Sequence, residues 1–228
     1  MRGRHFIYRV LIYNLGLLIL AFGVAFSINS DLGATPISAL PLVISLIAGI
    51  DTGVCVTVIF LFYILIQIVI LRKEFKWINL SQIIFSTIFG YFVDFTRLVL
   101  GNFRIPTYAG QLCMTGISAA LVACGVAVYI EARLVNMPAE GLILAVAFKI
   151  PRIEFHNIKI MLDSTAVTLS VALSFIFWGE LRGVREGTII CAVLIGKLIP
   201  VMKKMITPAI CSIGLKINEE IQPEASLK

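Results

Sequence analysis

The chain has 228 residues, of which 59% are hydrophobic and only 14% are charged. A soluble domain carries about 25% charged residues, so this composition excludes the ordinary soluble classes and predicts an integral membrane protein. The formal net charge is +6. The basic residues lie mostly at the ends of apolar runs, where membrane orientation accounts for them better than nucleic acid binding does.

Six apolar runs follow one another along the chain, at residues 10–28, 54–71, 83–100, 112–130, 158–178 and 188–205. Each is close to the roughly 20 residues that a helix needs to cross the hydrocarbon core, and none alternates as barrel strands do. The fold class is therefore predicted to be all-α and integral to the membrane. We expect one membrane domain over residues 1–228, with the first helix retained and a short polar tail at 216–228.

A polar stretch, SDLGATPISALP at residues 30–41, separates the first run from a short apolar piece at 37–50. A second short piece, at 139–150, follows the fourth long run in the same way. At 1.5 Å per residue these pieces reach only about 18–21 Å, which is less than the roughly 30 Å thickness of the core. They either cross the membrane with tilt or return to the side they entered.

The two polar breaks belong to an internal repeat. Residues 23–40 align without gaps on residues 125–142 at an offset of 102, and seven of the eighteen positions are identical. The matches Gly23/Gly125 and Pro36/Pro138 carry most weight, because apolar matches are common in membrane proteins. Repeat one is predicted at 8–100 and repeat two at 110–206, each with three long helices and one short Pro-initiated helix, re-entrant or tilted.

Two topologies fit this repeat. If both short pieces return, the chain crosses six times and the repeats are inverted; if both span, it crosses eight times and they run parallel. With the N-terminus inside, the six-span arrangement gathers more Lys and Arg on the inner side, so the positive-inside rule favours it. We therefore expect a multi-pass protein of the bacterial cytoplasmic membrane with a cytoplasmic N-terminus.

The element NSDLGATPIS at residues 29–38, after a first helix headed by Arg, resembles the YczE/YyaS/YitT family of bacterial membrane proteins. In that family a similar xADLGxSPwd element follows the first helix. Ile37 departs from the pattern, because Trp or Phe is frequent there. The resemblance implies location and fold more than activity; transport is often suspected for the family, without an agreed substrate.

Broken backbone inside a membrane is tolerated where it is buried in protein or lines a wet cavity, and paired Gly/Pro interruptions in two repeats point to a transporter binding site. A half-helix N-terminus is also partially positive. The predicted substrate-binding residues at these breaks are Asp31, Thr35, Pro36, Arg133, Asn136, Pro138 and Glu140. The alternative is that both breaks are turns outside the membrane, with solvated side chains.

Ionisable groups at membrane depth form a second set of candidates, because each is costly to insert. They are Asp94, Arg97, Asp163 and Lys197. Asp94 and Arg97 are three residues apart and could pair on one helix face. Arg133 or Lys197 is a possible partner for Asp163. Function and structural ion pairing both remain open for these groups.

Several chemistries lack their sequence signal. The five cysteines form no CxxC pair, and the two histidines have no partner at metal-ligand spacing, so we expect no metal site and no cofactor. There is no HExxH, GxSxG or phosphate-binding loop, and an enzyme is not expected.

The first functional hypothesis is therefore a secondary transporter of a small polar or anionic solute. Two alternatives stay open: a substrate-binding membrane subunit of an ATPase-driven importer, and a non-transporting scaffold or regulator. Membrane lipid and an unknown small solute or ion are the expected partners, and a homodimer or an ATPase partner is left open.

Overall fold

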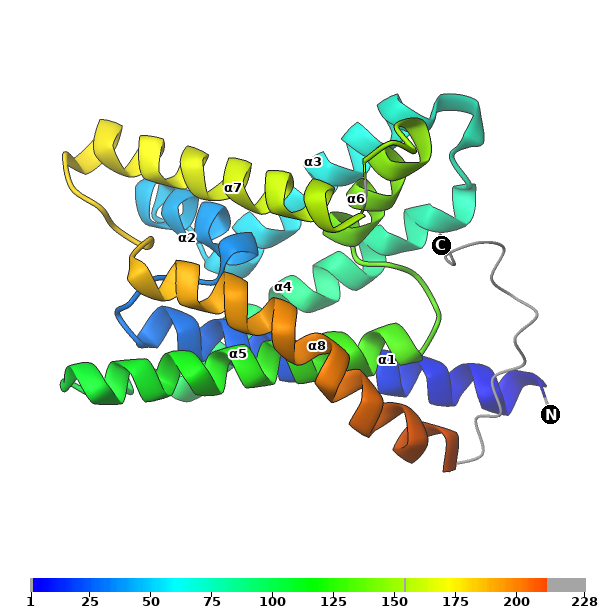
Figure 1. Cartoon of the computed structure of the whole chain (residues 1–228), viewed down its shortest axis with the longest axis horizontal. Helices are drawn as coiled ribbons and strands as arrows, with labels where there is room; N and C mark the ends of the chain where they lie inside the picture. The colour runs from blue at the N-terminus through cyan, green and yellow to red at the C-terminus, as the bar shows by residue number, and fades with distance from the viewer. Residues whose placement is uncertain (1, 154, 213–228) are drawn as a thin grey trace.

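The computed structural model describes residues 2–153 and 155–212, which are helices joined by loops and turns, without strands in that part of the chain. The predicted polar tail at 216–228 lies outside the described residues. The elements, shown in Figure 1, are α1 (Arg2–Asn29), α2 (Pro36–Ala48), α3 (Thr52–Leu71), η1 (Arg72–Glu74), η2 (Trp77–Leu80), α4 (Ser81–Leu100), α5 (Tyr108–Glu131), α6 (Pro138–Lys149), α7 (Phe155–Trp178) and α8 (Glu186–Ser212).

Within the described ranges, five helices are long and apolar enough to cross a membrane, judged by length and composition. They cover Phe6–Asn29, Thr52–Glu74, Trp77–Leu100, Tyr108–Glu131 and Asn157–Trp178. The sixth predicted run, 188–205, lies within the 27 residues of α8, which is not among the five. Its sequence carries Lys197, Lys203 and Lys204, which reduce its apolar character.

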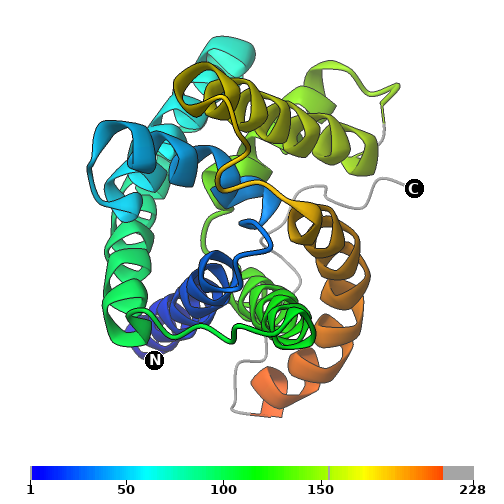
Figure 2. The same ribbon diagram turned by 90° about the vertical axis from the view of Figure 1, so that its left-hand side faces the viewer.

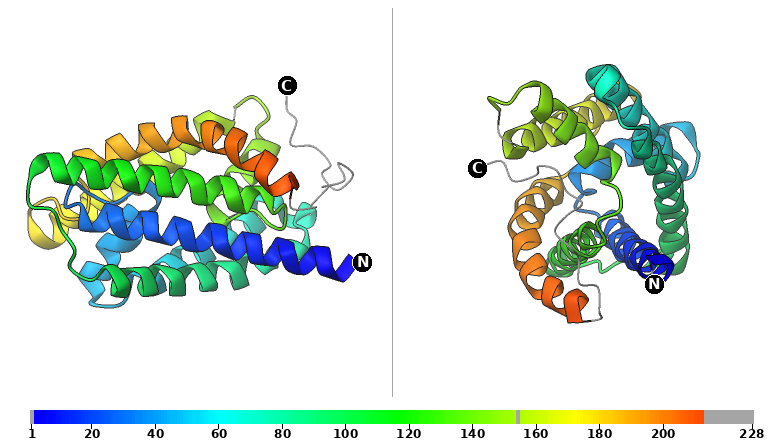
Figure 3. Two further views of the ribbon diagram at one scale, coloured as in Figure 1. Left: turned by 90° about the horizontal axis from the view of Figure 1, so that it is seen from below. Right: turned by 90° about the vertical axis from the view of Figure 1, so that its right-hand side faces the viewer.

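The centre of the fold is the contact between α1 and α5, which lie side by side and run in opposite directions (Figure 3). Their backbones touch at glycines. A Cβ on Gly16 would lie 2.9 Å from the carbonyl of Gly125, and one on Gly23 would lie 3.0 Å from the carbonyl of Ser118. The Ser118 hydroxyl in turn donates to the Gly23 carbonyl at 2.7 Å. Small residues permit this approach, as is usual between membrane helices.

The other long helices flank this pair. α4 packs on α1, and α8 packs on α5. On the far side of the bundle lie α3 and α7, and the two short helices pack against them, α2 on α7 and α6 on α3 (Figure 2). The chain between α1 and α2 thus runs from the central pair toward the opposite layer.

We call the end of the bundle where α1 begins the N-terminal end, and the other the opposite end. Contacts at the opposite end join the loops after α1, α4 and α7. Asn29 Nδ2 donates to the Gly101 carbonyl at 3.0 Å, and the Ala34 amide donates to the Gly183 carbonyl at 2.9 Å. At the N-terminal end the Thr207 hydroxyl donates to Glu131 at 2.8 Å, and Lys149 pairs with Glu74 at 2.6 Å. Successive long helices therefore run up and down between these two ends (Figure 1).

Each short helix begins at a proline, as the sequence predicts. Pro36 and Pro138 occupy the first turn of α2 and α6, where a missing N–H leaves no helical hydrogen bond unmade. α2 ends at Ala48 and is followed by the C-cap residue Gly49, which has a left-handed φ of 67° and whose amide donates to the Ser45 carbonyl. Helices of 13 and 12 residues are about 18–20 Å long.

The predicted pair between Asp94 and Arg97 is not formed among the ion pairs of the described residues. Asp94 Oδ1 instead accepts from the amide of Gly53 at 2.7 Å, and Arg97 donates to the hydroxyl of Thr52. Both side chains of α4 thus bind the first turn of α3, whose own N-cap residue, Asp51, makes no side-chain capping bond. A carboxylate at a helix N-terminus satisfies a free amide and interacts favourably with the helix dipole.

We expect Asp94→Ala to lower the free energy of unfolding by about 1 kcal/mol, the usual cost of losing an N-cap. Thermal unfolding of the purified protein in detergent measures the loss. Asp51→Ala is the matched control, because Asp51 occupies the cap position without capping the helix. An equal loss in both variants would show that Asp94 is not the capping group.

Candidate functional site

A cavity of about 200 Å³ lies between the two layers of the bundle, and every long and short helix contributes to it. A single water needs only about 10–15 Å³ of such space, so the cavity has room for a small organic molecule. Most of its wall is apolar. The lining comprises Leu20, Val24, Thr35, Pro36, Ile37, Ser38, Val56, Phe60, Phe89, Val122, Val126, Tyr129, Ile130, Met137, Glu140, Lys159, Asp163, Ala192, Ile195 and Ile199.

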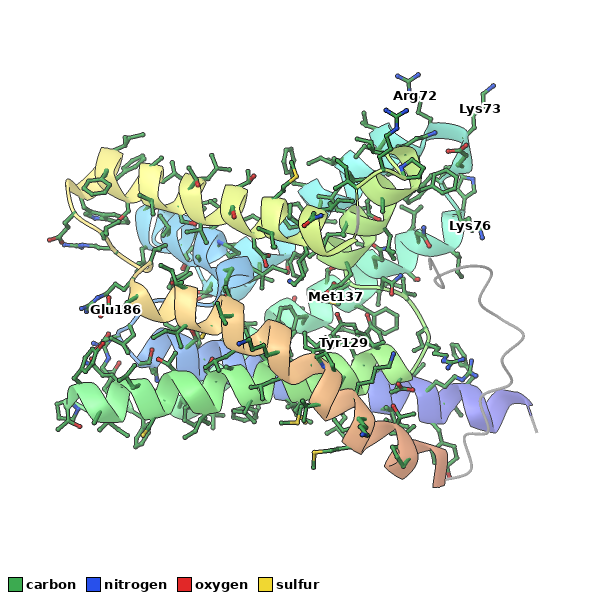
Figure 4. All side chains as sticks on the ribbon, viewed as in Figure 1. Arg72, Lys73, Lys76, Tyr129, Met137 and Glu186 are labelled. Atoms are coloured by element: carbon green, nitrogen blue, oxygen red, sulfur yellow. The ribbon has the colours of Figure 1, made fainter. Side chains whose placement is uncertain are left out.

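Both Pro-initiated helices begin at this cavity. The first turn of α2 contributes Thr35, Pro36 and Ser38, and the start of α6 contributes Met137 and Glu140. Thr35 occupies the N-cap position of α2, but its side chain makes no capping bond; the hydroxyls of Thr35 and Ser38 bond to each other. Figure 4 places Met137 and Tyr129 close together between the two layers.

The polar groups at this cavity gather where α5, α6 and α7 meet. They are Tyr129, Glu140, Lys159 and Asp163. Behind Tyr129 lies Tyr13 of α1, whose ring is 5.5 Å away in an edge-on contact. The hydroxyls of both tyrosines and Oε2 of Glu140 are buried and lack a hydrogen-bond partner within the described residues. Buried polar atoms are nearly always bonded, so these three are exceptional.

Asp163 finds a partner on its own helix. Lys159 Nζ lies 3.1 Å from Asp163 Oδ2, one helical turn away, and both side chains line the cavity. This corrects the prediction that Arg133 or Lys197 would pair with Asp163. The Lys197 side chain is exposed on α8, and it forms no ion pair in the part of the chain that the structure describes.

The cavity wall includes three of the seven predicted substrate-binding residues, namely Thr35, Pro36 and Glu140. Pro138 lies beside it, and its carbonyl accepts from Gln67 Nε2 at 3.0 Å. Arg133 and Asn136 are exposed outside the wall.

Asp31 also lies outside the wall, on the loop after α1 at the opposite end. Its carboxylate pairs with Arg104 at 3.2 Å, and its carbonyl accepts from Arg185 at 3.0 Å. Asp31 and Arg133, which align at the sequence offset of 102, both have a positive φ, of 59° and 47°, a conformation uncommon for residues other than glycine. Neither side chain is part of the cavity wall.

Sequence reasoning missed Tyr129, Tyr13 and Lys159. Tyr129 stands inside the repeated segment, but an aromatic residue in an apolar run is most simply interpreted as core. Lys159 had a usable signal, because it lies four residues before Asp163, the spacing at which helical side chains meet.

The side chains at this cavity do not resemble a metal-binding site. Within the described ranges no group of three or more His, Cys, Asp or Glu side chains is placed to hold an ion. The acceptors at the cavity instead suit a ligand that carries hydrogen-bond donors.

A family model described as a family of unknown function, DUF6198, matches residues 7–204. The chain is 26% identical over 196 residues to the uncharacterized protein YyaS of Bacillus subtilis (strain 168), covering 85% of this chain and 92% of that protein. It is also 26% identical over 188 residues to the uncharacterized membrane protein YczE of the same strain, covering 82% of this chain and 81% of that protein.

These matches confirm the resemblance drawn from residues 29–38 and extend it over most of the chain. No solved structure matches the chain. Since the family model covers far more than half of the sequence, this membrane protein belongs to the DUF6198 family, whose function is unknown.

Proposed function

We propose that the protein is a secondary transporter that binds a small polar solute in the cavity between its two layers. One observation carries the proposal: the two Pro-initiated short helices approach from opposite ends of the bundle and both begin at the same cavity. Transporters with internal repeats place their substrate near the membrane midplane, at the ends of such interrupted helices. A purely structural break would not require a shared cavity.

The packing supports an inverted repeat. At the offset of 102, α5 is the counterpart of α1, and the two run in opposite directions. At this offset Gly16 corresponds to Ser118, and Gly23 corresponds to Gly125. The contact of Gly16 with Gly125 and the contact of Gly23 with Ser118 are therefore equivalent. The same offset relates the contact between α1 and α4 to the contact between α5 and α8. It also relates the contact between α2 and α7 to the contact between α6 and α3.

The positions of the helix ends support the six-span topology. α2 starts at the cavity and leads to α3, whose first turn binds the last part of α4 at the opposite end. α6 starts at the cavity and ends at Lys149, which pairs with Glu74 at the N-terminal end. In this proposal each short helix returns to the side that the chain entered, and α8 is the sixth crossing.

Charge supports the orientation. Arg72, Lys73 and Lys76 cluster in the turn between α3 and α4, at the N-terminal end (Figure 4). By the positive-inside rule that end faces the cytoplasm, in the inner membrane of a bacterium.

The opposite end is held closed in this conformation. Asp31 bridges Arg104 and Arg185, and the Gly187 amide donates to the Leu32 carbonyl at 2.8 Å, which ties the loops after α1, α4 and α7 together. The polar part of the cavity lies instead toward the start of α7, at the N-terminal end. Transport requires that these loops separate while the N-terminal end closes. Inverted repeats permit this change, because each repeat can adopt the conformation that the other had.

The test is accessibility from both sides of the membrane. Ser38→Cys places a thiol on the cavity wall with little change in size. We expect a membrane-impermeant methanethiosulfonate reagent to modify it from either face of oriented vesicles, because alternating access opens the cavity to each side in turn. Mass spectrometry of the intact protein measures the modified fraction.

Ser86→Cys is the matched control, since Ser86 is fully buried in α4 away from the cavity wall and should stay unmodified. Both variants are made after replacing Cys113, Cys124 and Cys211 by Ser, while the buried Cys55 and Cys191 are kept. Modification of Ser38→Cys from one face only, or from neither, would contradict alternating access.

A further inference from the structure

The charged groups on the cavity wall do not balance. They are Glu140, Lys159 and Asp163, and Lys159 is already bound to Asp163 at 3.1 Å. Two carboxylates thus share one ammonium group, and Glu140 itself forms no ion pair within the described residues. An ionised carboxylate in an apolar surrounding is costly unless it is paired.

The unsatisfied atoms point to the same deficit. In the part of the chain that the structure describes, neither Oε2 of Glu140 nor the hydroxyl of Tyr129 has a hydrogen-bond partner. The Tyr129 side chain is only 2% exposed. A carboxylate can only accept hydrogen bonds, whereas a phenol can accept as well as donate. Both atoms can therefore be satisfied by one ligand that brings several N–H donors. An anion would instead bring further acceptors beside the Glu140 carboxylate.

The rest of the wall suits a hydrocarbon body. Phe60 and Phe89 stack at 6.0 Å, and aliphatic side chains of α1, α5 and α8 complete the surface. The hydroxyls of Thr35 and Ser38 face this part, but they bond to each other. A ligand that fits the whole cavity has an apolar body and a single polar end.

We propose that the cavity binds a small alkylamine in its ammonium form. The ammonium group donates to Oε2 of Glu140 and to the Tyr129 hydroxyl, and the alkyl chain lies against the apolar wall. This assignment deepens the proposed transport function and rests on it for the solute's movement, whereas binding is a property of the cavity alone. It replaces the anionic half of the expectation drawn from the sequence.

The experiment uses the full chain purified in detergent, with hexylamine, hexan-1-ol and hexanoate as probes that share one alkyl chain. We expect hexylamine to raise the melting temperature in a saturable way, because a ligand that binds the folded state stabilises it. Hexanol and hexanoate should give no saturable rise. Glu140→Gln should weaken hexylamine binding at least tenfold, and Tyr129→Phe, which removes only the hydroxyl, should weaken it at least threefold.

One variant serves as the control and should keep wild-type affinity for hexylamine within a factor of three. Glu131→Gln changes another buried carboxylate, which Thr207 already satisfies and which lies outside the cavity wall. If Glu140→Gln does not yield folded protein, the hexylamine affinity of Tyr129→Phe tests the assignment instead.

Saturable stabilisation by hexanoate or hexanol equal to that by hexylamine would overturn the assignment, as would unchanged hexylamine affinity in the Glu140 and Tyr129 variants. Stabilisation by none of the three probes would overturn it too. These outcomes leave transport standing if Ser38→Cys is modified from both faces. Conversely, if hexylamine binds but Ser38→Cys is modified from one face only, the amine site is supported and the proposed transport function is contradicted.

Discussion

We expect Gly125→Leu to abolish the folded bundle. A Cβ at Gly125 would lie 2.6 Å from the backbone nitrogen of Leu20 and 2.7 Å from the carbonyl of Gly16. Backbone atoms cannot move aside as a flexible side chain can, so α1 and α5 must separate along their whole crossing. Overpacking of a core typically costs about 1–3 kcal/mol and occasionally more, and here both central helices are displaced. We therefore expect a loss of at least about 3 kcal/mol.

Size-exclusion chromatography of the solubilised protein, followed by thermal unfolding, measures this effect. Gly116→Leu is the control on the same helix, because a Cβ at Gly116 meets nothing within 4 Å. It should leave the elution volume and melting temperature unchanged. A monodisperse Gly125→Leu protein with wild-type stability would mean that the two helices do not cross at these glycines.

The second large effect is expected for Gln67→Leu. The Gln67 side chain, 1% exposed, joins three helices: its Nε2 donates to Gln82 Oε1 of α4 at 3.2 Å and to the Pro138 carbonyl of α6 at 3.0 Å. Leucine removes both bonds and leaves the buried amide of Gln82 unpaired. An unsatisfied buried polar group costs about 1–3 kcal/mol, and we expect a destabilisation in that range. Because the start of α6 loses an anchor, solute binding should weaken as well.

Gln111→Leu is the matched control, since its side chain makes no hydrogen bond in the part of the chain covered by the structure, and the substitution is the same. The melting temperatures of the two variants are compared in one detergent. If Gln67→Leu proves as stable as the wild type, the Gln67–Gln82–Pro138 network does not hold α6 in place.

The sequence was sufficient for those features that depend on local chemistry. Prolines at the starts of two short apolar pieces predicted α2 and α6, and each of these helices begins at its proline. Five of the six predicted long runs coincide with helices of membrane-spanning length and composition. The sixth, in α8, is an apolar run interrupted by the basic residues Lys197, Lys203 and Lys204.

Contacts between distant segments were not accessible in the same way. Asp94 was assigned to Arg97 because they share a helix face, but the free amide of Gly53, 41 residues earlier in the chain, binds it instead. The candidates at the two polar breaks were chosen by position alone. In the structure, Asp31 and Arg133 lie outside the cavity wall, whereas Glu140, in the first turn of α6, is part of it.

The positions of the helix ends have one further consequence. α1 begins and α8 finishes at the same end of the bundle (Figure 1), while the loop between α4 and α5 lies at the other. The order in which the halves are translated is therefore not fixed by their packing. A gene that encoded α5–α8 first and α1–α4 second, with a short linker from α8 to α1, would preserve every neighbour in the assembled protein.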